Sequence, residues 1–178
     1  MIVTLTHIDV IRIASFLNSD AREVLKYVAF YQIIGEGGQK LITPPIITTR
    51  GIAYLGLLKL SDGSCIFLSK NKCSIYPARP TACRNFPFTF QVKNGWLYQG
   101  ISIRAKEYCK GLGKGDEISE KKLAKKGTKT IKELKEYEEL VSKWNSLALK
   151  GQISPTPQLF IEYVLSRGFL DLSLLPLK

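Results

Sequence analysis

The sequence contains little histidine, methionine or tryptophan: one His, one Met and two Trp among 178 residues. With His7 as the single histidine, no Ser-His-Asp triad can be assembled with known partners. Cys-His catalysis would require His7 beside a cysteine. A polar residue in the first turn of a helix is the favoured interpretation of His7, and a metal ligand is the alternative. No nucleotide-binding fingerprint such as G-x-x-x-x-G-K-[ST] occurs, so no catalytic constellation is identified.

Long hydrophobic runs are also lacking. No stretch of about 18 uncharged apolar residues occurs, so we expect no membrane contact through a spanning helix. The N-terminal MIVTLTHIDV has no basic segment followed by an apolar one, which argues against a signal peptide. A cytoplasmic location is the default expectation. In a reducing cytoplasm, four cysteines favour metal or redox chemistry over structural disulfides, although hyperthermophiles are an exception.

Acidic residues are scarce relative to basic ones. The chain has 26 Lys and Arg against 15 Asp and Glu, a formal net charge of +11. Such a balance favours an anionic partner, either nucleic acid or an acidic protein surface. A soluble lysine-rich surface of the kind found in thermophiles explains the charge equally well.

The four cysteines carry the strongest chemical signal. Cys65, Cys73 and Cys83 lie in CIFLSKNKCSIYPARPTACRNFP, and Cys109 follows in CKGLGKG. Four thiolates complete the ligand shell of a zinc ion or an iron–sulfur cluster. Zinc modules usually contain close C-x2-4-C pairs, whereas the gaps here are C-x7-C-x9-C-x25-C. The spacing therefore favours an iron–sulfur cluster, 4Fe-4S first, over zinc. Two disulfides, scattered core cysteines and an empty vestigial site are the alternatives.

The run C-x-F-L followed by C-S-I-Y-x-x-R-P-x-x-C-R-x-F-P resembles the core of the YkgJ-type cysteine-cluster proteins, which are described as zinc- or iron-chelating domains. The C-x-G-x-G-K-G run around Cys109 and the opening TLTHIDVIRIASFL fit the same family. The resemblance covers roughly residues 3 to 125. It implies that Cys65, Cys73, Cys83 and Cys109 converge on one metal site.

Members of that family usually open with a C-x-x-C-x-x-C-C-like cluster just before this helix. Met1 stands almost where such a cluster would end. Either this member has lost the cluster or its start lies further upstream. Some members are attached to flagellin lysine methylases, so the resemblance also implies a remote link to methyl transfer, which similarity alone does not establish.

Several residues around the cysteines are candidates to support the site. We expect Arg79 and Arg84 to donate N–H groups to sulfur or to backbone carbonyls and to offset thiolate charge, with Tyr76 beside them. Two solvated arginines are the alternative. A possible anion-binding loop follows Cys109 and consists of Gly111, Gly113, Lys114 and Gly115. Close passage of the backbone beside a metal is the favoured use of these glycines.

Hydrophobic spacing predicts helices in the N-terminal part. Thr6 to Leu17 reads as a helix capped by Thr6, with Asp9 as its capping-box partner. Ser19 is expected to cap a second helix from about Asp20 to Ile33, which Gly35, Gly37 and Gly38 end. Pro44 and Pro45 mark an extended segment.

Alternation predicts two hairpins in the middle of the chain. One joins Ile52–Leu60 to Cys65–Leu68, and the other joins 86–92 to 96–103 through Asn94-Gly95. A short helix after Arg79-Pro80 carries Cys83. Four aromatics of the second hairpin are either core residues, the favoured interpretation, or a stacking platform for nucleic acid: Phe88, Phe90, Trp96 and Tyr98.

Helical spacing returns near the C-terminus. A short basic helix over 119–126 is expected to break at Gly127, and a long helix follows over 130–149. A last helix runs from about Pro157 to Ser166 with Gly168 as its C-cap, and the apolar tail packs on the body. The predicted fold class is α+β, with small antiparallel hairpins packed between N-terminal and C-terminal helices. Residues 1–126 form a metal-binding domain and 127–178 a helical extension packed on it.

Two functional hypotheses follow. The first is a protein that holds an iron–sulfur cluster or zinc through the four cysteines, with an unidentified protein or redox partner. The second is a basic interaction module in which the metal is purely structural and the lysine-rich 110–135 segment binds nucleic acid or an acidic protein.

Overall fold

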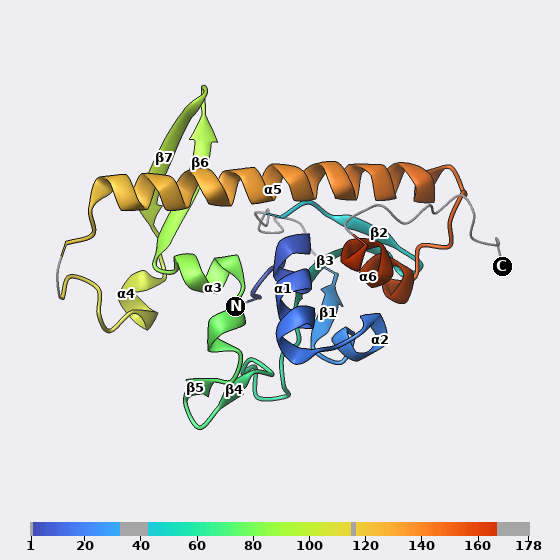
Figure 1. The fold of residues 1–178 in the computed structure, drawn as a ribbon, viewed down its shortest axis with the longest axis horizontal. Coiled ribbons are helices and arrows are strands. Elements are labelled where there is room, and N and C mark those ends of the chain that lie inside the picture. Colours follow the sequence, from blue (N-terminus) through green and yellow to red (C-terminus); the bar gives the residue numbers. More distant parts are fainter. Residues whose placement is uncertain (1, 33–42, 115–116, 167–178) are drawn as a thin grey trace.

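The computed structural model describes residues 2–32, 43–114 and 117–166, and these residues form an α+β fold (Figure 1). The helices are α1 (His7–Leu17), α2 (Ala21–Val24), the 3-10 helix η1 (Tyr76–Ala78), α3 (Thr81–Asn85), α4 (Ala105–Tyr108), α5 (Glu120–Leu149) and α6 (Pro157–Leu165). The strands are β1 (Val28–Tyr31), β2 (Ile46–Thr48), β3 (Gly51–Leu57), β4 (Leu68–Ser69), β5 (Lys72–Cys73), β6 (Phe88–Lys93) and β7 (Trp96–Ile101). All the strand pairs in these residues are antiparallel, as the predicted fold class requires.

The first helix begins as predicted. Thr6 caps α1 through its hydroxyl, which accepts from the Asp9 N–H, and the Asp9 carboxylate accepts from the Thr6 N–H. This reciprocal capping box satisfies two backbone donors that the first turn of a helix otherwise leaves unpaired. Asn18 ends the helix in the left-handed conformation that asparagine tolerates.

The second predicted helix is a short helix followed by a strand. Asp20, rather than Ser19, caps α2, which ends at Val24, and β1 begins at Val28. The strand sequence VAFY is β-branched and aromatic, and it pairs with β3 in the register Val28↔Leu57. Pairing with a strand distant in sequence therefore overrides the helical spacing. With β2 on the other side of β3, the three strands form the order β1-β3-β2.

The first predicted hairpin is reduced to a single bridge. β3 ends at Leu57, and the returning segment pairs with the chain only through the bridge between Lys59 and Cys65. The strand that follows, β4, pairs with β5 instead, in the register Leu68↔Cys73. This correction places Cys65 at the isolated bridge and Cys73 at the end of the short strand β5.

The second hairpin is confirmed. β6 and β7 pair from Phe88↔Ile101 to Lys93↔Trp96, and both turn residues, Asn94 and Gly95, have positive φ. That conformation is the one that an Asn-Gly hairpin turn requires. The hairpin crosses the N-terminal half of α5, and its tip projects beyond the helix (Figure 1).

Gly127 does not break the long helix, contrary to the prediction. α5 is continuous from Glu120 to Leu149 and passes without interruption through the boundary predicted between residues 126 and 127. A Cβ atom at Gly127 would lie 2.7 Å from Cδ1 of Phe90 and 3.0 Å from Cδ2 of Leu97. The glycine therefore serves the close approach of the hairpin to the helix.

One hydrophobic core joins the N-terminal and C-terminal parts. It gathers residues from α1, the three-stranded sheet, η1, α5 and α6. Its largest fully buried side chains are Trp144, Tyr137, Tyr163 and Phe160. The Trp144 ring lies 5.0 Å from the Phe160 ring and donates its Nε1–H to the Ile47 carbonyl at 2.9 Å. Aromatic packing with a satisfied polar atom fixes α5 and α6 against the sheet.

The last predicted helix is confirmed over Pro157–Leu165, with Thr156 as its N-cap and Ser166 as its C-cap. The expectations for Gly35, Gly37, Gly38, Gly115, Gly168 and the apolar tail lie outside the described residues. A search of the described residues finds no helix long and apolar enough to cross a membrane.

Candidate metal centre

The four cysteines lie on four different local structures. Cys65 forms the bridge with Lys59, Cys73 is the last residue of β5, Cys83 is the middle residue of α3, and Cys109 caps the C-terminus of α4. All four are free thiols of intermediate exposure, so the structure contains none of the disulfides considered from the sequence. Cys65 and Cys73 pack against the edge of the hydrophobic core.

Three of these thiols share one electrostatic neighbourhood. The pKa of Cys83 is raised to about 11, first by burial and then by the nearby Cys65 and Cys73 thiols and the Asp9 carboxylate, whereas Arg79 lowers it. Each of these groups therefore acts on the Cys83 sulfur. Cys109 is not among them.

The three thiols are not arranged as a complete metal-binding site. In the part of the chain that the structure describes, no group of three or more His, Cys, Asp or Glu side chains is placed to hold a metal ion. The ligand set Cys65, Cys73, Cys83 and Cys109 therefore stays a prediction.

The chemistry of the three thiols fits a metal. Burial and repulsion from nearby negative groups oppose charged sulfur at Cys83, and the Arg79 cation counters them. A metal cation would supply the missing positive charge and favour the deprotonated form of the thiols. The donor set is also soft, which suits zinc or the iron of a cluster.

A buried carboxylate, Asp9, anchors the segment that carries Cys83. Asp9 is 1% exposed, and its Oδ1 accepts from the Thr81 N–H at 2.8 Å, the Thr81 hydroxyl at 2.9 Å and Arg12 Nη1 at 3.0 Å. The same Arg12 nitrogen donates to the Arg79 carbonyl at 3.1 Å. The start of α3 is thereby fixed onto α1.

Helix α5 holds the same segment from the other side. The Thr81 hydroxyl lies 3.0 Å from Oε2 of the buried Glu133, and Asn85 Nδ2 donates to the Thr130 hydroxyl at 2.8 Å. Lys126 Nζ donates to the Arg84 carbonyl at 2.6 Å. Residues 79–85 are therefore clamped between α1 and α5, which restricts where Cys83 can point.

Sequence reasoning missed this clamp. Asp9 was recognised only as a capping-box residue, and Arg12, Thr81 and Glu133 were not singled out. Thr81 is 72 residues from Asp9 and 52 residues from Glu133 in the chain. No local sequence pattern can therefore indicate these contacts.

The predicted supporting residues occupy different environments. The Arg79 guanidinium lies 3.6 Å above the ring centroid of the exposed Tyr76, in a cation–π contact, and it acts on Cys83. Arg84 is exposed and donates through Nη2 to the Pro77 carbonyl at 3.0 Å. Both arginines lower the pKa of Lys126, after the larger effect of its burial. Lys126 therefore lies near both arginines.

The glycines after Cys109 do not bring the backbone against another group in the described residues. A Cβ atom at Gly111 or Gly113 would meet nothing within 4 Å, and only Gly113 has a positive φ. Lys114 donates its N–H to the Gly111 carbonyl at 3.1 Å, which closes an ordinary turn. His7 is buried at the start of α1 and stacks on Tyr137 of α5, with ring centroids 5.9 Å apart.

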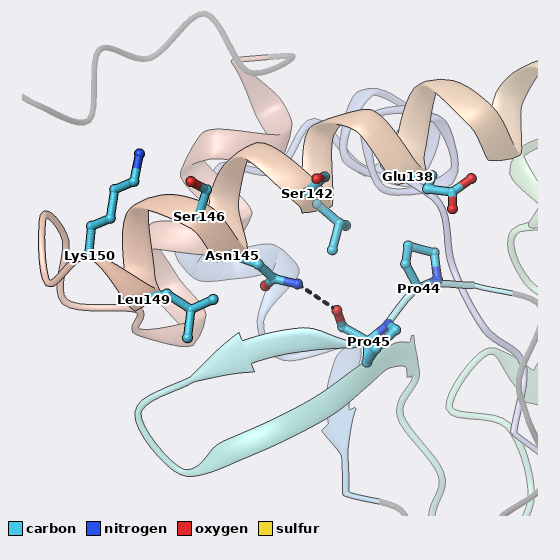
Figure 2. Close-up of a pocket in the computed structure, with 9 residues that line it drawn as sticks. Pro44, Pro45, Glu138, Ser142, Asn145, Ser146, Leu149 and Lys150 are labelled. Atoms are coloured by element: carbon cyan, nitrogen blue, oxygen red, sulfur yellow. Dashed lines mark hydrogen bonds between the residues drawn. The ribbon is translucent and has the colours of Figure 1, made fainter.

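An open groove lies away from the cysteines, along the C-terminal half of α5. Pro44 and Pro45 face Glu138, Ser142 and Leu149 across it, and Asn145 Nδ2 donates to the Pro45 carbonyl at 2.9 Å (Figure 2). No cysteine or histidine lines this groove. It offers neither soft ligands nor a nucleophile, so we do not place the functional site there.

Comparison with known proteins agrees with the chemistry of the thiols. The family model CxxCxxCC, described as "Putative zinc- or iron-chelating domain", matches residues 3–110. An uncharacterized protein of Methanocaldococcus jannaschii is 38% identical over 116 residues, which are 64% of this chain and 53% of that protein. The chain thus spans about half the length of the curated relative that it matches. No solved structure matches.

Proposed function

This chain belongs to the CxxCxxCC family of zinc- or iron-chelating domains, and from that premise we propose that it binds one metal centre through Cys65, Cys73 and Cys83, with Cys109 as the fourth ligand. The observation that supports the proposal is that Cys65 and Cys73, from separate local structures, both lie close enough to Cys83 to raise the pKa of its thiol. Scattered core cysteines would not be expected to place three of four thiols within electrostatic range of one another.

An iron–sulfur cluster, 4Fe-4S first, is the preferred occupant. The gaps between the cysteines lack the close C-x2-4-C pairs of common zinc modules. A cluster would supply one-electron redox chemistry, whereas zinc at a closed site would supply structure alone. In either case the protein contributes the thiolates, and Arg79 offsets part of their charge.

The Asp9 clamp supports the same assignment. A metal site needs its ligands held in orientation by a hydrogen-bonded outer layer. The carboxylates of Asp9 and Glu133 both lie within hydrogen-bonding distance of the Thr81 hydroxyl. Thr81 is two residues before Cys83 in α3, so these contacts orient the short helix that carries the proposed ligand.

The test is anaerobic purification followed by metal and sulfide analysis and a visible spectrum. We expect brown protein with iron, sulfide and broad visible absorbance, and colourless protein with zinc would correct the metal while keeping the site. Replacing Cys65, Cys73 or Cys83 singly by serine should remove most of the metal. Ser61→Ala, an exposed change in the turn before Cys65, is the matched control and should retain it. Wild-type protein without metal, or serine variants with wild-type metal content, would refute the proposal.

A further inference from the structure

Three cations lie close together where η1, α3 and α5 meet. Lys126 Nζ, from α5, donates to the Arg84 carbonyl at 2.6 Å, and Arg84 Nη2 donates to the Pro77 carbonyl at 3.0 Å. The Arg79 guanidinium lies 3.6 Å from the ring centroid of Tyr76, the residue before Pro77 in η1. Both arginines therefore reach back onto the same short helix, and the lysine lies beside them. We refer to Arg79, Arg84 and Lys126 as the basic cluster.

The described residues do not neutralise the basic cluster. No ion pair in this part of the chain joins any of its three members to an acidic side chain. Glu133, the acidic residue of α5 that contacts α3, pairs with Lys129 instead. The pKa of Lys126 is lowered first by burial and then by the two arginines, and no carboxylate is among the groups that act on it. Like charges held together in this way favour the binding of an anion.

The basic cluster also has donors that the protein leaves without acceptors. Arg79 Nε is buried and has no hydrogen-bond partner. Its guanidinium is positioned by the aromatic ring of Tyr76 rather than by a carboxylate. Arg84 is exposed, and Arg79 and Lys126 are partly exposed, so a small ligand can reach the cluster from solvent. An anion would accept from these donors and supply the missing negative charge.

We infer that the basic cluster is a binding site for the dianionic phosphate group of a small phosphomonoester. Two forked guanidinium groups and one ammonium match the several acceptor oxygens of a terminal phosphate. A carboxylate or a phosphodiester carries a single negative charge, which leaves more of the cluster uncompensated and makes it the weaker ligand.

The inference stands whether or not the thiols hold a metal. Arg79 acts on Cys83, so a metal–thiolate centre would take up part of its charge. Arg84 and Lys126 are not among the groups that act on Cys83, and they would keep their positive charge beside an occupied metal site. None of the three cations is a proposed metal ligand.

Calorimetric titration of the full-length protein with methyl phosphate at pH 8 tests the site. The monoester is a dianion at that pH, because the second pKa of a phosphomonoester is about 6. Dimethyl phosphate and acetate, at the same ionic strength, are the singly charged controls. We expect methyl phosphate to bind about tenfold more tightly than either. Equal affinity for the three compounds would show only the general attraction of a basic protein for anions and would overturn the inference.

Substitutions locate the binding in the basic cluster. Arg84→Gln and Lys126→Gln should each weaken the binding of methyl phosphate about tenfold. Arg84→Lys keeps the charge but loses the fork, so its affinity should fall between those of Arg84→Gln and wild type. Lys125→Gln, at the exposed neighbouring position of α5, is the matched control and should bind as wild type. Metal content should be unchanged in all of these variants, so failure of the phosphate site and failure of the metal site are distinguishable.

The two glutamine variants also lose a hydrogen bond within the protein, so their thermal unfolding without ligand shows whether they fold. Folded variants that bind methyl phosphate as tightly as wild type would overturn the inference. The selectivity of the wild-type protein tests it independently of any variant.

The β6–β7 hairpin provides a control on another surface. Trp96 and Tyr98 are 74% and 47% exposed on the face of the hairpin that is turned away from α5, so the core interpretation of the hairpin aromatics is right for Phe90 and wrong for these two. Trp96 has one cation, Lys93, opposite it in the ladder. Trp96→Ala should therefore bind methyl phosphate as wild type, and a loss of binding in this variant would place the site on the hairpin and overturn the assignment to the basic cluster.

Discussion

At the scale of single residues, the candidate site depends on partly buried groups whose charges and hydrogen bonds balance one another. Burial, two further thiols and a carboxylate raise the pKa of Cys83, and Arg79 opposes their effect. Thr81 links two buried carboxylates, Asp9 and Glu133, and so connects α1 to α5 just before that cysteine. Removing one partner from such a cluster leaves the others uncompensated, which costs more than the contact itself contributes.

The raised pKa of Cys83 predicts a loss of stability at alkaline pH in the metal-free protein. Its pKa is about 11 in the folded state and about 8.5 in an unfolded chain, so folding favours the protonated thiol. That contribution is complete below about pH 8.5 and disappears as the pH rises toward 11. Urea unfolding of reduced, chelator-treated protein at both ends of this window measures it. Wild type should lose more stability than Cys83→Ala, and Cys109→Ala should behave as wild type. Equal losses in wild type and Cys83→Ala would contradict the raised pKa.

Because Asp9 is buried and Asp20 is exposed, we expect the same Asp→Asn substitution to change the free energy of unfolding unequally at the two positions. Asp9→Asn should lower the free energy of unfolding by about 2–4 kcal/mol, because Arg12 and the Thr81 donors lose a buried charged acceptor. Asp20→Asn at the exposed N-cap of α2 should change it by less than about 0.5 kcal/mol, because asparagine caps as well as aspartate. Similar effects of the two changes in denaturant unfolding would show that the clamp does not stabilise the fold.

At the scale of elements, the sequence predicts structure that depends on neighbouring residues and fails where contacts between distant segments decide the structure. The capping box of α1, the Asn-Gly hairpin and the start of α6 are predictable because each depends on residues a few positions apart. Local spacing predicts helix at β1 because its pairing with β3 joins residues 23 to 29 positions apart, from Tyr31↔Tyr54 to Val28↔Leu57. Gly127 was read as a breaker because its reason, the approach of Phe90 and Leu97, lies in another element.

Gly127 supplies a prediction at this scale. Alanine in a helix interior is ordinarily better than glycine by about 1 kcal/mol. Here the added Cβ would meet Phe90 and Leu97 at 3.0 Å or less, so we expect Gly127→Ala to destabilise the protein by about 1–3 kcal/mol. Thr128→Ala, at the exposed neighbouring position, is the control and should lie within about 0.5 kcal/mol of wild type. Thermal unfolding that shows Gly127→Ala to be more stable than wild type would contradict the packing described for the hairpin.

At the scale of the whole molecule, the family match and the hydrophobic core cover different parts of the chain. The family model covers residues 3–110, but α5 and α6 lie beyond it and contribute Tyr137, Trp144 and Phe160 to the same core. α5 also contributes Glu133 to the clamp around Thr81. The candidate ligands could be named from the sequence because cysteine is rare in it, whereas the residues that hold them in place come from helices far along the chain.

The most direct test of the central claim is X-ray absorption at the edge of the metal that the anaerobically purified protein contains. Thiolate ligation by Cys65, Cys73 and Cys83 predicts sulfur scatterers at about 2.3 Å as the dominant first shell. The first-shell sulfur count should fall in the serine variant of any of these cysteines that still holds metal. A first shell made only of nitrogen and oxygen at about 2.0–2.2 Å would contradict the account, because the described cysteines would then not be the ligands.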